Sequence, residues 1–598
     1  MSKSAGKGMK MKAKPSRSKG WRLASLILLS ALLLPAGGSP AKKAGLVKSE
    51  TDWQKERAVI LQALNRELAR SKEKLKLQDF DPPYFVSYLL NDYEIKSLTG
   101  SYGTVYSNRH NHRREVYAEV RVGDYQFDNS GRGGFEFRYE PDSDFQPIEH
   151  IEVPVDDDLL GVRDALWGLT DIRYKTALNA YHQKKGREAY EVKEDANLPD
   201  FTHEQPSRFQ DQHREFRFDD AAWAEAIRQV TGYFRQFDRI YSNTFTVTAE
   251  KYVYYYVNTE GGEVVEERTF FNWWMDVGSR ADDGLEVSNF RRHFSQQIQE
   301  RPDLPALMAE AKSLVEELLA LRQAPVLPPY NGPAILAPQV SGVLFHEAIG
   351  HRLEGERMRN PGEGFTFKGK VGEQVIPAFL TVTDDPTQAR FGDTSLAGHY
   401  QYDQEGVPAR AVVLIQNGIL KNYLMSRTPI KGFDHSNGHG RSDGETDPMA
   451  RMGNLIVTST NRLPPEALKK KLIELVKQQG KPFGLIVRET LGGETRTRRE
   501  DMQGFRDRPR LVYKVDPETG AETLVRGVEL VGTPLISINK IVATGTEMGV
   551  FNGYCGAESG YVPVSTVTPS TLLQEVELQK SSEKPQRPPI LKPPAFEP

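Results

Sequence analysis

The sequence predicts an α+β protein of two domains: an N-terminal α/β domain at residues 42–324 and a mainly β C-terminal domain at residues 325–575. In the first half, amphipathic helical segments occur beside segments that alternate apolar and polar residues. A proline-rich stretch, PVLPPYNGP at residues 325–333, marks the boundary, and the sequence beyond it is richer in strand-like segments. With 598 residues, of which 38% are hydrophobic, the chain is long enough to bury sizeable cores.

Helical segments are predicted from apolar residues that recur every three, four or seven positions. In the first of them, Trp53, Ile60, Leu64 and Leu68 fall on one helix face. The predicted helices cover residues 42–80, 159–185, 218–238, 304–324 and 464–479.

Strands are predicted where β-branched and aromatic residues alternate with polar ones, at residues 84–108, 114–129 and 244–280. The turn Glu260-Gly261-Gly262 predicts a hairpin inside the last range. The Tyr and Trp residues of these strands are typical of core and cross-strand packing rather than of a ligand site.

The N-terminus has the pattern of a secretory signal peptide at residues 1–41. A basic segment precedes the apolar run LASLILLSALLL, which is too short for an ordinary membrane span. We therefore expect an exported protein, periplasmic or secreted, with no integral membrane segment after the signal is removed; an uncleaved anchor is the alternative. At the other end, the Pro- and Lys-rich residues 576–598 predict a disordered tail.

The charge distribution argues against nucleic acid as a partner. The formal net charge is −3, but residues 1–22 carry eight Lys or Arg and no acid, so the chain without them has a charge of −11. Binding to phosphate backbones needs a basic surface, which an acidic body does not favour.

The motif HEAIGH at residues 346–351 suggests a metal site with unusual spacing. In H-E-x-x-H, two histidines four residues apart share a helix face, whereas His346 and His351 are five apart. On a regular helix they point roughly 140° apart, so the helix must end or distort inside the motif. Gly350 is the expected position, because glycine tolerates unusual backbone angles. A helix with two histidines that bind no metal is the alternative.

A third ligand would have to come from elsewhere in the chain. Cys555 is the chain's one cysteine and lies in a glycine-flanked segment, FNGYCGAESGYVPVS. Its thiolate is a good zinc ligand, and zinc binding gives an exported protein a reason to keep a lone cysteine. A small buried core residue is the alternative.

Several motifs together resemble the TldD/PmbA family of zinc metallopeptidases. The similar segments are GVLFHEAIGHRLEGE, YDQEGVPARAVVLIQNGILKNYLMSR, GHGRSDGETDPMARMGNLIV, GTPLISINKIVATGTE and YCGAESGYVPVS. The resemblance covers roughly residues 330–575. It implies a zinc ion (Zn2+) held by His346, His351 and Cys555, with Glu347 as the catalytic glutamate. It also implies peptide substrates and a homodimer, or a heterodimer with a related TldE/PmbA-like subunit.

Other residues are candidates for supporting roles. Glu354 or Glu356 could accept the free ring N–H of a metal-binding histidine. We predict contacts with substrate for two histidines and two arginines, although ordinary loop histidines and surface ion pairs are the alternatives. These residues are His399, His439, Arg441 and Arg451.

The leading functional hypothesis is therefore a zinc-dependent metallopeptidase that hydrolyses small or unfolded peptides, using a zinc-activated water and a glutamate general base. Two alternatives are open. One is a non-catalytic peptide-binding partner subunit, against which the intact Glu347 argues. The other is a zinc amidase that acts on a non-peptide substrate, since the same chemistry serves any acyl transfer.

Overall fold

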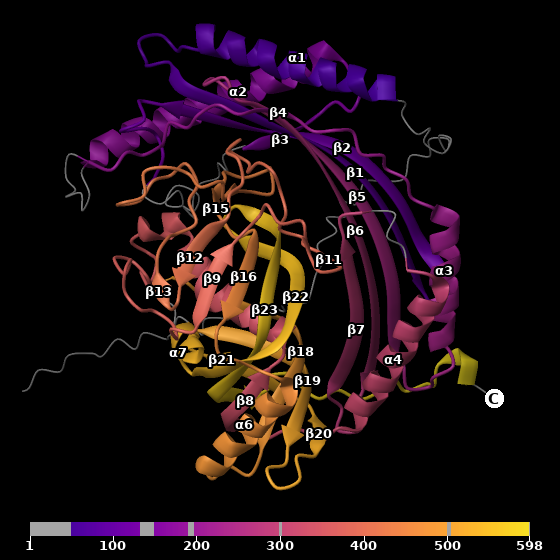
Figure 1. Cartoon of the computed structure of the whole chain (residues 1–598). Coiled ribbons are helices and arrows are strands. Elements are labelled where there is room, and N and C mark those ends of the chain that lie inside the picture. The colour runs from indigo at the N-terminus through magenta and orange to yellow at the C-terminus, as the bar shows by residue number, and fades with distance from the viewer. Residues whose placement is uncertain (1–49, 132–148, 189–196, 298–301, 499–503, 597–598) are drawn as a thin grey trace, which may run out of the picture. The chain divides into compact units, whose positions relative to one another are not determined.

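Two large β-sheets dominate the computed structural model of the chain (Figure 1). The structure describes residues 50–131, 149–188, 197–297, 302–498 and 504–596. By their contacts, residues 48–598 form one unit. The predicted α+β class is confirmed, while the predicted signal peptide lies outside the described residues.

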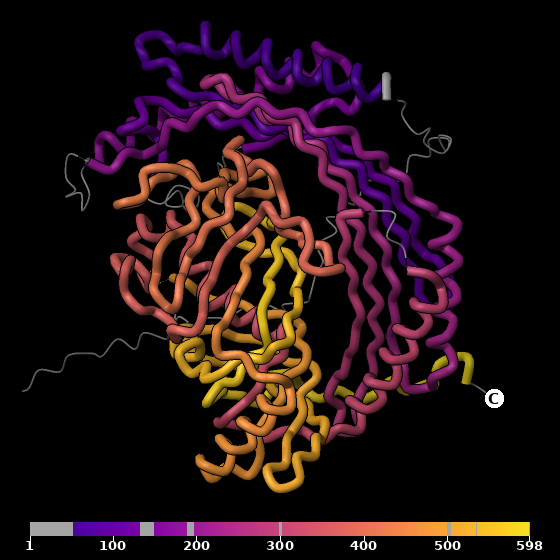
Figure 2. The backbone as a smooth tube through the Cα atoms, in the orientation of Figure 1, coloured from indigo at the N-terminus to yellow at the C-terminus, as the bar shows by residue number. Residues whose placement is uncertain are grey.

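The N-terminal sheet has seven strands in the order β3-β2-β1-β5-β6-β4, with β7 paired to β6. Its strands are β1 (Pro83–Ser101), β2 (Thr104–Val122), β3 (His150–Val153), β4 (Arg208–Gln210), β5 (Ser242–Asn258), β6 (Glu263–Arg280) and β7 (Glu286–Ser295). The long strands pair antiparallel and curve around the C-terminal strands (Figure 2). The predicted hairpin at Glu260-Gly261-Gly262 is confirmed: it joins β5 to β6, with Gly261 in the left-handed region that favours glycine.

Four helices cover one face of this sheet: α1 (Glu50–Lys74), α2 (Leu159–Glu188), α3 (Asp220–Phe234) and α4 (Leu304–Gln323). Side chains alternate along each strand, so Phe271, Trp273 and Met275 pack in one apolar cluster with residues of α3 and α4. The other face of the same strands, including Trp274 and its cross-strand partner Arg292, is turned away from those helices.

The C-terminal sheet has twelve strands, and its main order is β13-β12-β9-β16-β23-β21-β19-β18-β8. Its first six strands are β8 (Tyr330–Leu336), β9 (Leu380–Asp384), β12 (Val412–Gln416), β13 (Ile419–Leu420), β16 (Asn454–Ser459) and β17 (Arg462–Leu463). The other six are β18 (Gly484–Thr495), β19 (Phe505–Val515), β20 (Glu522–Val525), β21 (Val528–Gly532), β22 (Ile541–Ala557) and β23 (Gly560–Lys580).

Helices and short strands complete the C-terminal part. The helices are α5 (Pro338–Phe345), α6 (Pro465–Gln478) and α7 (Pro534–Asn539), and the two-residue pairs are β10 (Arg390–Phe391) with β11 (Thr394–Ser395) and β14 (Gly440–Arg441) with β15 (Met449–Ala450). Apolar residues of α5, β8, β9, β16 and β23 share the largest core cluster. This core supports the segment that follows α5, which carries the candidate metal ligands.

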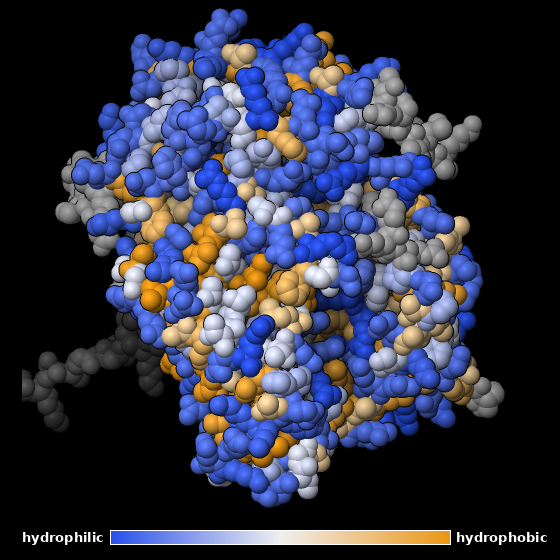
Figure 3. Space-filling view, viewed as in Figure 1, coloured by the Kyte–Doolittle hydropathy of each residue, from blue (hydrophilic) through white to orange (hydrophobic). Residues whose placement is uncertain are grey.

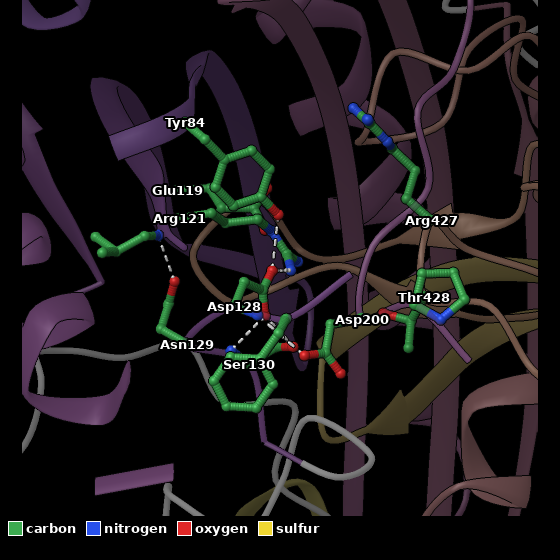
Figure 4. Close-up of polar contacts among 12 residues, drawn as sticks. Tyr84, Glu119, Arg121, Asp128, Asn129, Ser130, Asp200, Arg427 and Thr428 are labelled. Carbon is green, nitrogen blue, oxygen red and sulfur yellow. Dashed lines mark hydrogen bonds and ion pairs between the residues drawn. The ribbon is translucent and has the colours of Figure 1, made fainter. Parts of the chain in front are cut away.

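A buried polar cluster connects the N-terminal sheet to the C-terminal part (Figure 4). Asp128 accepts hydrogen bonds from Tyr84 and from Arg121, and its backbone N–H donates to Asp200. Asp200 also forms an ion pair with Arg359, at 3.0 Å. Arg359 directly follows the segment 346–358, which carries the two candidate histidine ligands. The cluster therefore holds this segment in place relative to the N-terminal sheet.

The C-terminal residues differ from the predicted disordered tail. Strand β23 runs to Lys580, beyond the predicted domain end at residue 575. Further on, Gln586 N–H donates to the carbonyl of Gly284, and its side-chain oxygen accepts from Arg280. The tail segment up to this point is therefore attached to the N-terminal sheet.

The surface view shows mostly hydrophilic side chains, with apolar ones gathered over the middle of the displayed face (Figure 3). No helix within the described residues is both long and apolar enough to cross a membrane.

Candidate metal centre

A π-helical turn explains the five-residue spacing of the two histidines. Helix α5 continues as a π-helix at His346–Gly350 and then as a 3-10 turn at His351–Leu353. The backbone N–H of His351 donates to the carbonyl of His346, which is the i→i−5 bond of a π-helix. One π turn therefore places residues i and i+5 on the same face, as one α turn does for i and i+4.

The predicted distortion of the helix is confirmed, but the predicted role of Gly350 is wrong. Gly350 has ordinary right-handed helical angles, φ −54° and ψ −62°. A Cβ atom at this position would instead lie 1.9 Å from Sδ of the buried Met452. Glycine is required here for close packing rather than for an unusual backbone conformation.

Three possible ligand atoms, from His346, His351 and Cys555, lie close together beside this turn. Nε2 of His346 lies 3.1 Å from Sγ of Cys555 on β22, and Nε2 of His351 lies 3.3 Å from the same sulfur. The three ligand atoms all lie within 4.8 Å of one another, and all three residues are buried. The structure thus brings together the two histidines and the cysteine that the sequence singled out.

The charges of these groups favour a bound cation. Burial by itself raises the pKa of Cys555, but His351, Arg451 and His346 lower it well below its ordinary value. Burial lowers the pKa of His351, and the nearby Cys555 and Glu354 raise it well above its ordinary value. A thiolate beside two imidazole rings is a donor set that a divalent cation can bind, with release of protons from the ligands.

Glu347 lies beside this trio. Its Oε2 is 4.0 Å from Nε2 of His351, and the side chain is buried. Burial, the largest effect, raises the pKa of this carboxyl above its ordinary value. A carboxyl group with a raised pKa, next to a candidate metal position, is suited to accept a proton from water.

Glu354 orients one of the candidate ligands. Its Oε1 lies 3.0 Å from Nδ1 of His351, which leaves Nε2 of the ring to face Cys555. Arg357 donates to Oε2 of Glu354 at 2.7 Å, and Arg451 forms an ion pair with Oε1 at 3.5 Å. Although burial raises the pKa of Glu354, His351 and Arg357 lower it to about 2. The carboxylate is therefore ionised at every ordinary pH.

Glu356, the other candidate for this role, faces a different environment. It accepts hydrogen bonds from the Ser426 hydroxyl and from the backbone N–H of Ala450. Of the two glutamates, Glu354 is the one that contacts a candidate ligand.

The two histidines predicted to touch substrate have internal partners. His399 has its Nδ1 2.9 Å from the carbonyl of Pro386. His439 is fully buried, and its Nε2 lies 3.2 Å from Asp384 while Nδ1 lies 3.0 Å from Asn437. Neither histidine lines the cavity next to the metal centre.

The two predicted arginines also lie behind the site rather than in its cavity. Arg441 donates to the carbonyl of Met452 and stacks on the ring of Tyr400. Arg451 donates to the carbonyl of Cys555 at 2.5 Å, in addition to its ion pair with Glu354. Arg451 thereby connects the two parts of the chain that supply the ligands.

The candidate ligands border a cavity of about 350 Å³. His346, Glu347, His351 and Cys555 form one wall. The sequence did not indicate the other walls. They are formed by residues of β18 and β19 (Leu491 to Thr495 and Arg508), by Tyr554 of β22, and by Arg292 of β7 in the N-terminal sheet. The alternation of side chains in RRHF could have shown that Arg291 and Arg292 face opposite ways, but not what each one faces.

Comparison with known proteins supports the resemblance. Residues 329–580 match the family described as PmbA/TldA metallopeptidase C-terminal domain. A metalloprotease of Methanocaldococcus jannaschii is 32% identical over 261 residues, which are 43% of this chain and 52% of the relative. A metalloprotease TldD homolog of Haemophilus influenzae is 32% identical over 272 residues, 44% of this chain and 52% of the relative.

A further relative, named as a zinc metalloprotease TldD homolog, is from Saccharolobus solfataricus. It is 27% identical over 249 residues, 41% of this chain and 51% of the relative. The chain spans about half the length of these curated relatives.

Solved structures show that the fold extends beyond the matched domain. TldE from Thermococcus kodakarensis aligns with a TM-score of 0.56 at 13% identity, covering 86% of this chain and 100% of that one. A Thermotoga maritima protein described as a candidate modulator of DNA gyrase aligns with a TM-score of 0.56 at 16% identity, covering 87% of this chain and 99% of that one. At these identities the likeness concerns the fold alone.

The class that fold and site define is therefore a metallopeptidase-type domain beside a curved N-terminal sheet. Residues 329–580 match the model of the PmbA/TldA metallopeptidase C-terminal domain family, which agrees with the resemblance drawn from the motifs.

Proposed function

We propose that this protein is a zinc-dependent metallopeptidase that hydrolyses small or unfolded peptides. One observation carries the proposal: His346, His351 and Cys555 converge within 4.8 Å beside the buried carboxyl group of Glu347, at the wall of a cavity. Three protein ligands and an adjacent cavity match a catalytic zinc site, which keeps one coordination position open, rather than a closed structural site.

The donor set fits zinc. Two imidazole nitrogens and one thiolate are typical zinc ligands, and the low pKa of Cys555 supplies the thiolate. A bound zinc ion would act as a Lewis acid toward a water molecule and a scissile carbonyl. Glu354 keeps the proton of His351 on Nδ1, so that Nε2 has a free lone pair for the metal.

In this proposal Glu347 acts first as the general base and then as the general acid. It would take a proton from the attacking water and deliver it to the leaving amine nitrogen. Because burial already raises the pKa of Glu347, the carboxyl group can hold that proton between the two steps. Removing the carboxylate therefore removes proton transfer without removing a metal ligand.

An extended peptide has a place to bind along β18. The pairing of β18 with β8 ends at Val487, and among the described residues the following segment pairs through β19 alone. Residues Leu491 to Thr495 of this half-paired segment line the cavity. Strand addition at such an edge binds backbone atoms, which favours broad sequence tolerance.

The test combines metal content with turnover. We expect about one zinc ion per chain in the purified protein and cleavage of disordered peptides. Glu347→Ala should keep the zinc and lose turnover by a factor of about 100 or more. Cys555→Ser should lose most of the zinc. Full zinc content and activity in Cys555→Ser would refute the ligand assignment, and wild-type protein that binds zinc but cleaves no peptide would refute the peptidase assignment.

We further propose that the protein is exported and acts as a homodimer or with a related TldE/PmbA-like subunit. The support is the signal-like segment at residues 1–41 and the motif resemblance. N-terminal sequencing of the mature protein and sedimentation of the purified protein, alone and with candidate partners, test both points. A mature chain that begins at Met1 would refute removal of the segment and leave the uncleaved anchor, and a monomer under every condition would refute the dimer.

A further inference from the structure

Arg292 stands out in the cavity because it is a cation without a counter-ion there. It lies on β7 and its guanidinium stacks on the ring of Phe551, 4.6 Å from the ring centroid. No hydrogen bond or ion pair joins its side chain to another residue within the described ranges. Arg292 is exposed to solvent in this structure, so a ligand that enters the cavity can reach its guanidinium.

The neighbouring arginine shows the contrast. Arg291 points to the opposite face of β7, where it forms ion pairs with Glu310 at 3.0 Å and with Glu317 at 2.6 Å. Two adjacent arginines therefore have different environments: one is neutralised by helix α4, while the other faces the cavity unneutralised. Because its side chain has no acceptor among the described residues, the guanidinium of Arg292 can donate its hydrogen bonds to an anion in the cavity.

One other arginine lines the cavity. Arg508 belongs to this lining, whereas Arg510 lies outside it and forms an ion pair with Glu489. Glu494 and Glu347 are the acids of the lining, and Glu347 belongs to the metal centre. Besides the metal centre, the lining thus carries two arginines, Arg292 from β7 and Arg508 from β19.

We propose that Arg292 binds a carboxylate of the peptide substrate, with Arg508 adding to the field. A guanidinium accepts a carboxylate in a two-pronged hydrogen-bonded pair, and stacking on Phe551 fixes its plane. The carboxylate is the C-terminal one or that of an acidic side chain.

The size of the cavity sets the distance to the bond that is cut. A cavity of about 350 Å³ is roughly 9 Å across, and an extended chain advances about 3.4 Å per residue. The anchored carboxylate therefore lies within about three residues of the scissile bond. This inference rests on the proposed peptidase function, for which it specifies the substrate class.

Binding to a variant that does not turn over tests the subsite separately from catalysis. Labelled peptides of one sequence, with a free C-terminal carboxylate or an amide and with or without one Asp, are titrated into zinc-loaded Glu347→Gln protein. We expect the carboxylate-bearing peptides to bind about 10- to 100-fold more tightly than the neutral amide. Adding Arg292→Gln should reduce this ratio to about one, and adding Arg292→Lys should leave an intermediate ratio, because charge remains without the planar fork.

Arg410→Gln is the matched control, because Arg410 is an exposed arginine that does not line the cavity. This variant should keep the full preference. Preference for the free C-terminus identifies the terminal carboxylate as the ligand, and preference for Asp identifies the side chain. Equal binding of all four peptides, or an unchanged preference in Arg292→Gln, would overturn the proposal.

A cleavage experiment with wild-type protein keeps the two proposals apart. Mass spectrometry should place the cut within about three residues of the anchored carboxylate. A preference in binding without any cleavage would contradict the peptidase proposal and leave the carboxylate subsite standing. Cleavage at positions unrelated to any carboxylate would overturn the subsite.

Discussion

Replacing Glu354 by Gln should weaken zinc binding without removing a zinc ligand. The buried carboxylate accepts from Nδ1 of His351 at 3.0 Å and from Nε of Arg357 at 2.7 Å, and it pairs with Arg451 at 3.5 Å. Gln offers one acceptor oxygen in place of two, so one of these donors loses its partner. A buried unpaired donor costs about 1–3 kcal/mol, and loss of such a second-layer partner weakens metal affinity by about 10- to 100-fold.

Competition with a chromophoric chelator at pH 7.5 measures the zinc dissociation constant. Glu356→Gln is the control, since Glu356 lies two residues away, is also buried, and contacts Ser426 and Ala450 instead of a ligand. We expect the control to stay within about threefold of wild type, because no ligand contact is lost. If Glu354→Gln also stays within threefold, or if both variants lose affinity equally, the orienting role of Glu354 is refuted.

Two further predictions concern stability. Gly350→Ala should destabilise the protein by about 1–3 kcal/mol, because the added Cβ overpacks against Met452. Gly168→Ala in α2 is the control and should not destabilise it, because a Cβ there meets nothing within 4 Å. Equal thermal midpoints for the two variants would contradict this prediction. Burial raises the pKa of Glu356 to about 7, so the folded state holds a proton that the unfolded state releases above about pH 4.5, and the stability contributed by this group falls as pH rises from about 4.5 to 7. The stability of Glu356→Gln relative to wild type, measured from denaturation midpoints, should therefore rise between pH 5 and pH 8. A stability difference that does not change with pH would refute the buried, protonated state of Glu356.

Local sequence patterns predicted the helices well. The helix expected at 304–324 spans Leu304–Gln323, and the helix expected at 464–479 spans Pro465–Gln478. Both have a clear apolar face and a proline at or near the first turn, so propensity and packing agree. The helix expected at 42–80 is shorter, Glu50–Lys74 among the described residues; beyond it Gln78 has a left-handed φ of 45°, and Pro82 and Pro83 follow.

The ligand set was also accessible from the sequence, because it depends on rare residue types. Because the chain has one cysteine and one H-E-x-x-x-H motif, few sets of three residues could serve as zinc ligands. The sequence did not predict the π turn: it indicated a distortion at Gly350, but Gly350 has helical angles and packs against Met452, about a hundred residues away. For the same reason, the roles predicted for His439 and Arg451 differ from their observed contacts, which join segments far apart in the chain.

The position of Arg292 in the cavity could not be predicted from the sequence. Its neighbour in the sequence is another arginine, and both look like ordinary strand residues. Side-chain alternation indicates that the two arginines face opposite ways, but only the structure shows that Arg292 lines the cavity beside the metal centre.

The position of Cys555 has a consequence for biosynthesis. The cysteine follows His351 by 204 residues and lies in β22, whose hairpin partner β23 comes last among the strands of the described chain. A nascent chain that has not yet released this hairpin from the ribosome lacks the thiolate, so the metal centre cannot assemble during most of translation. Truncated products that end before β22 lack the proposed third ligand for the same reason. If the proposed function holds, the hydrolytic centre can form only when the chain is nearly complete.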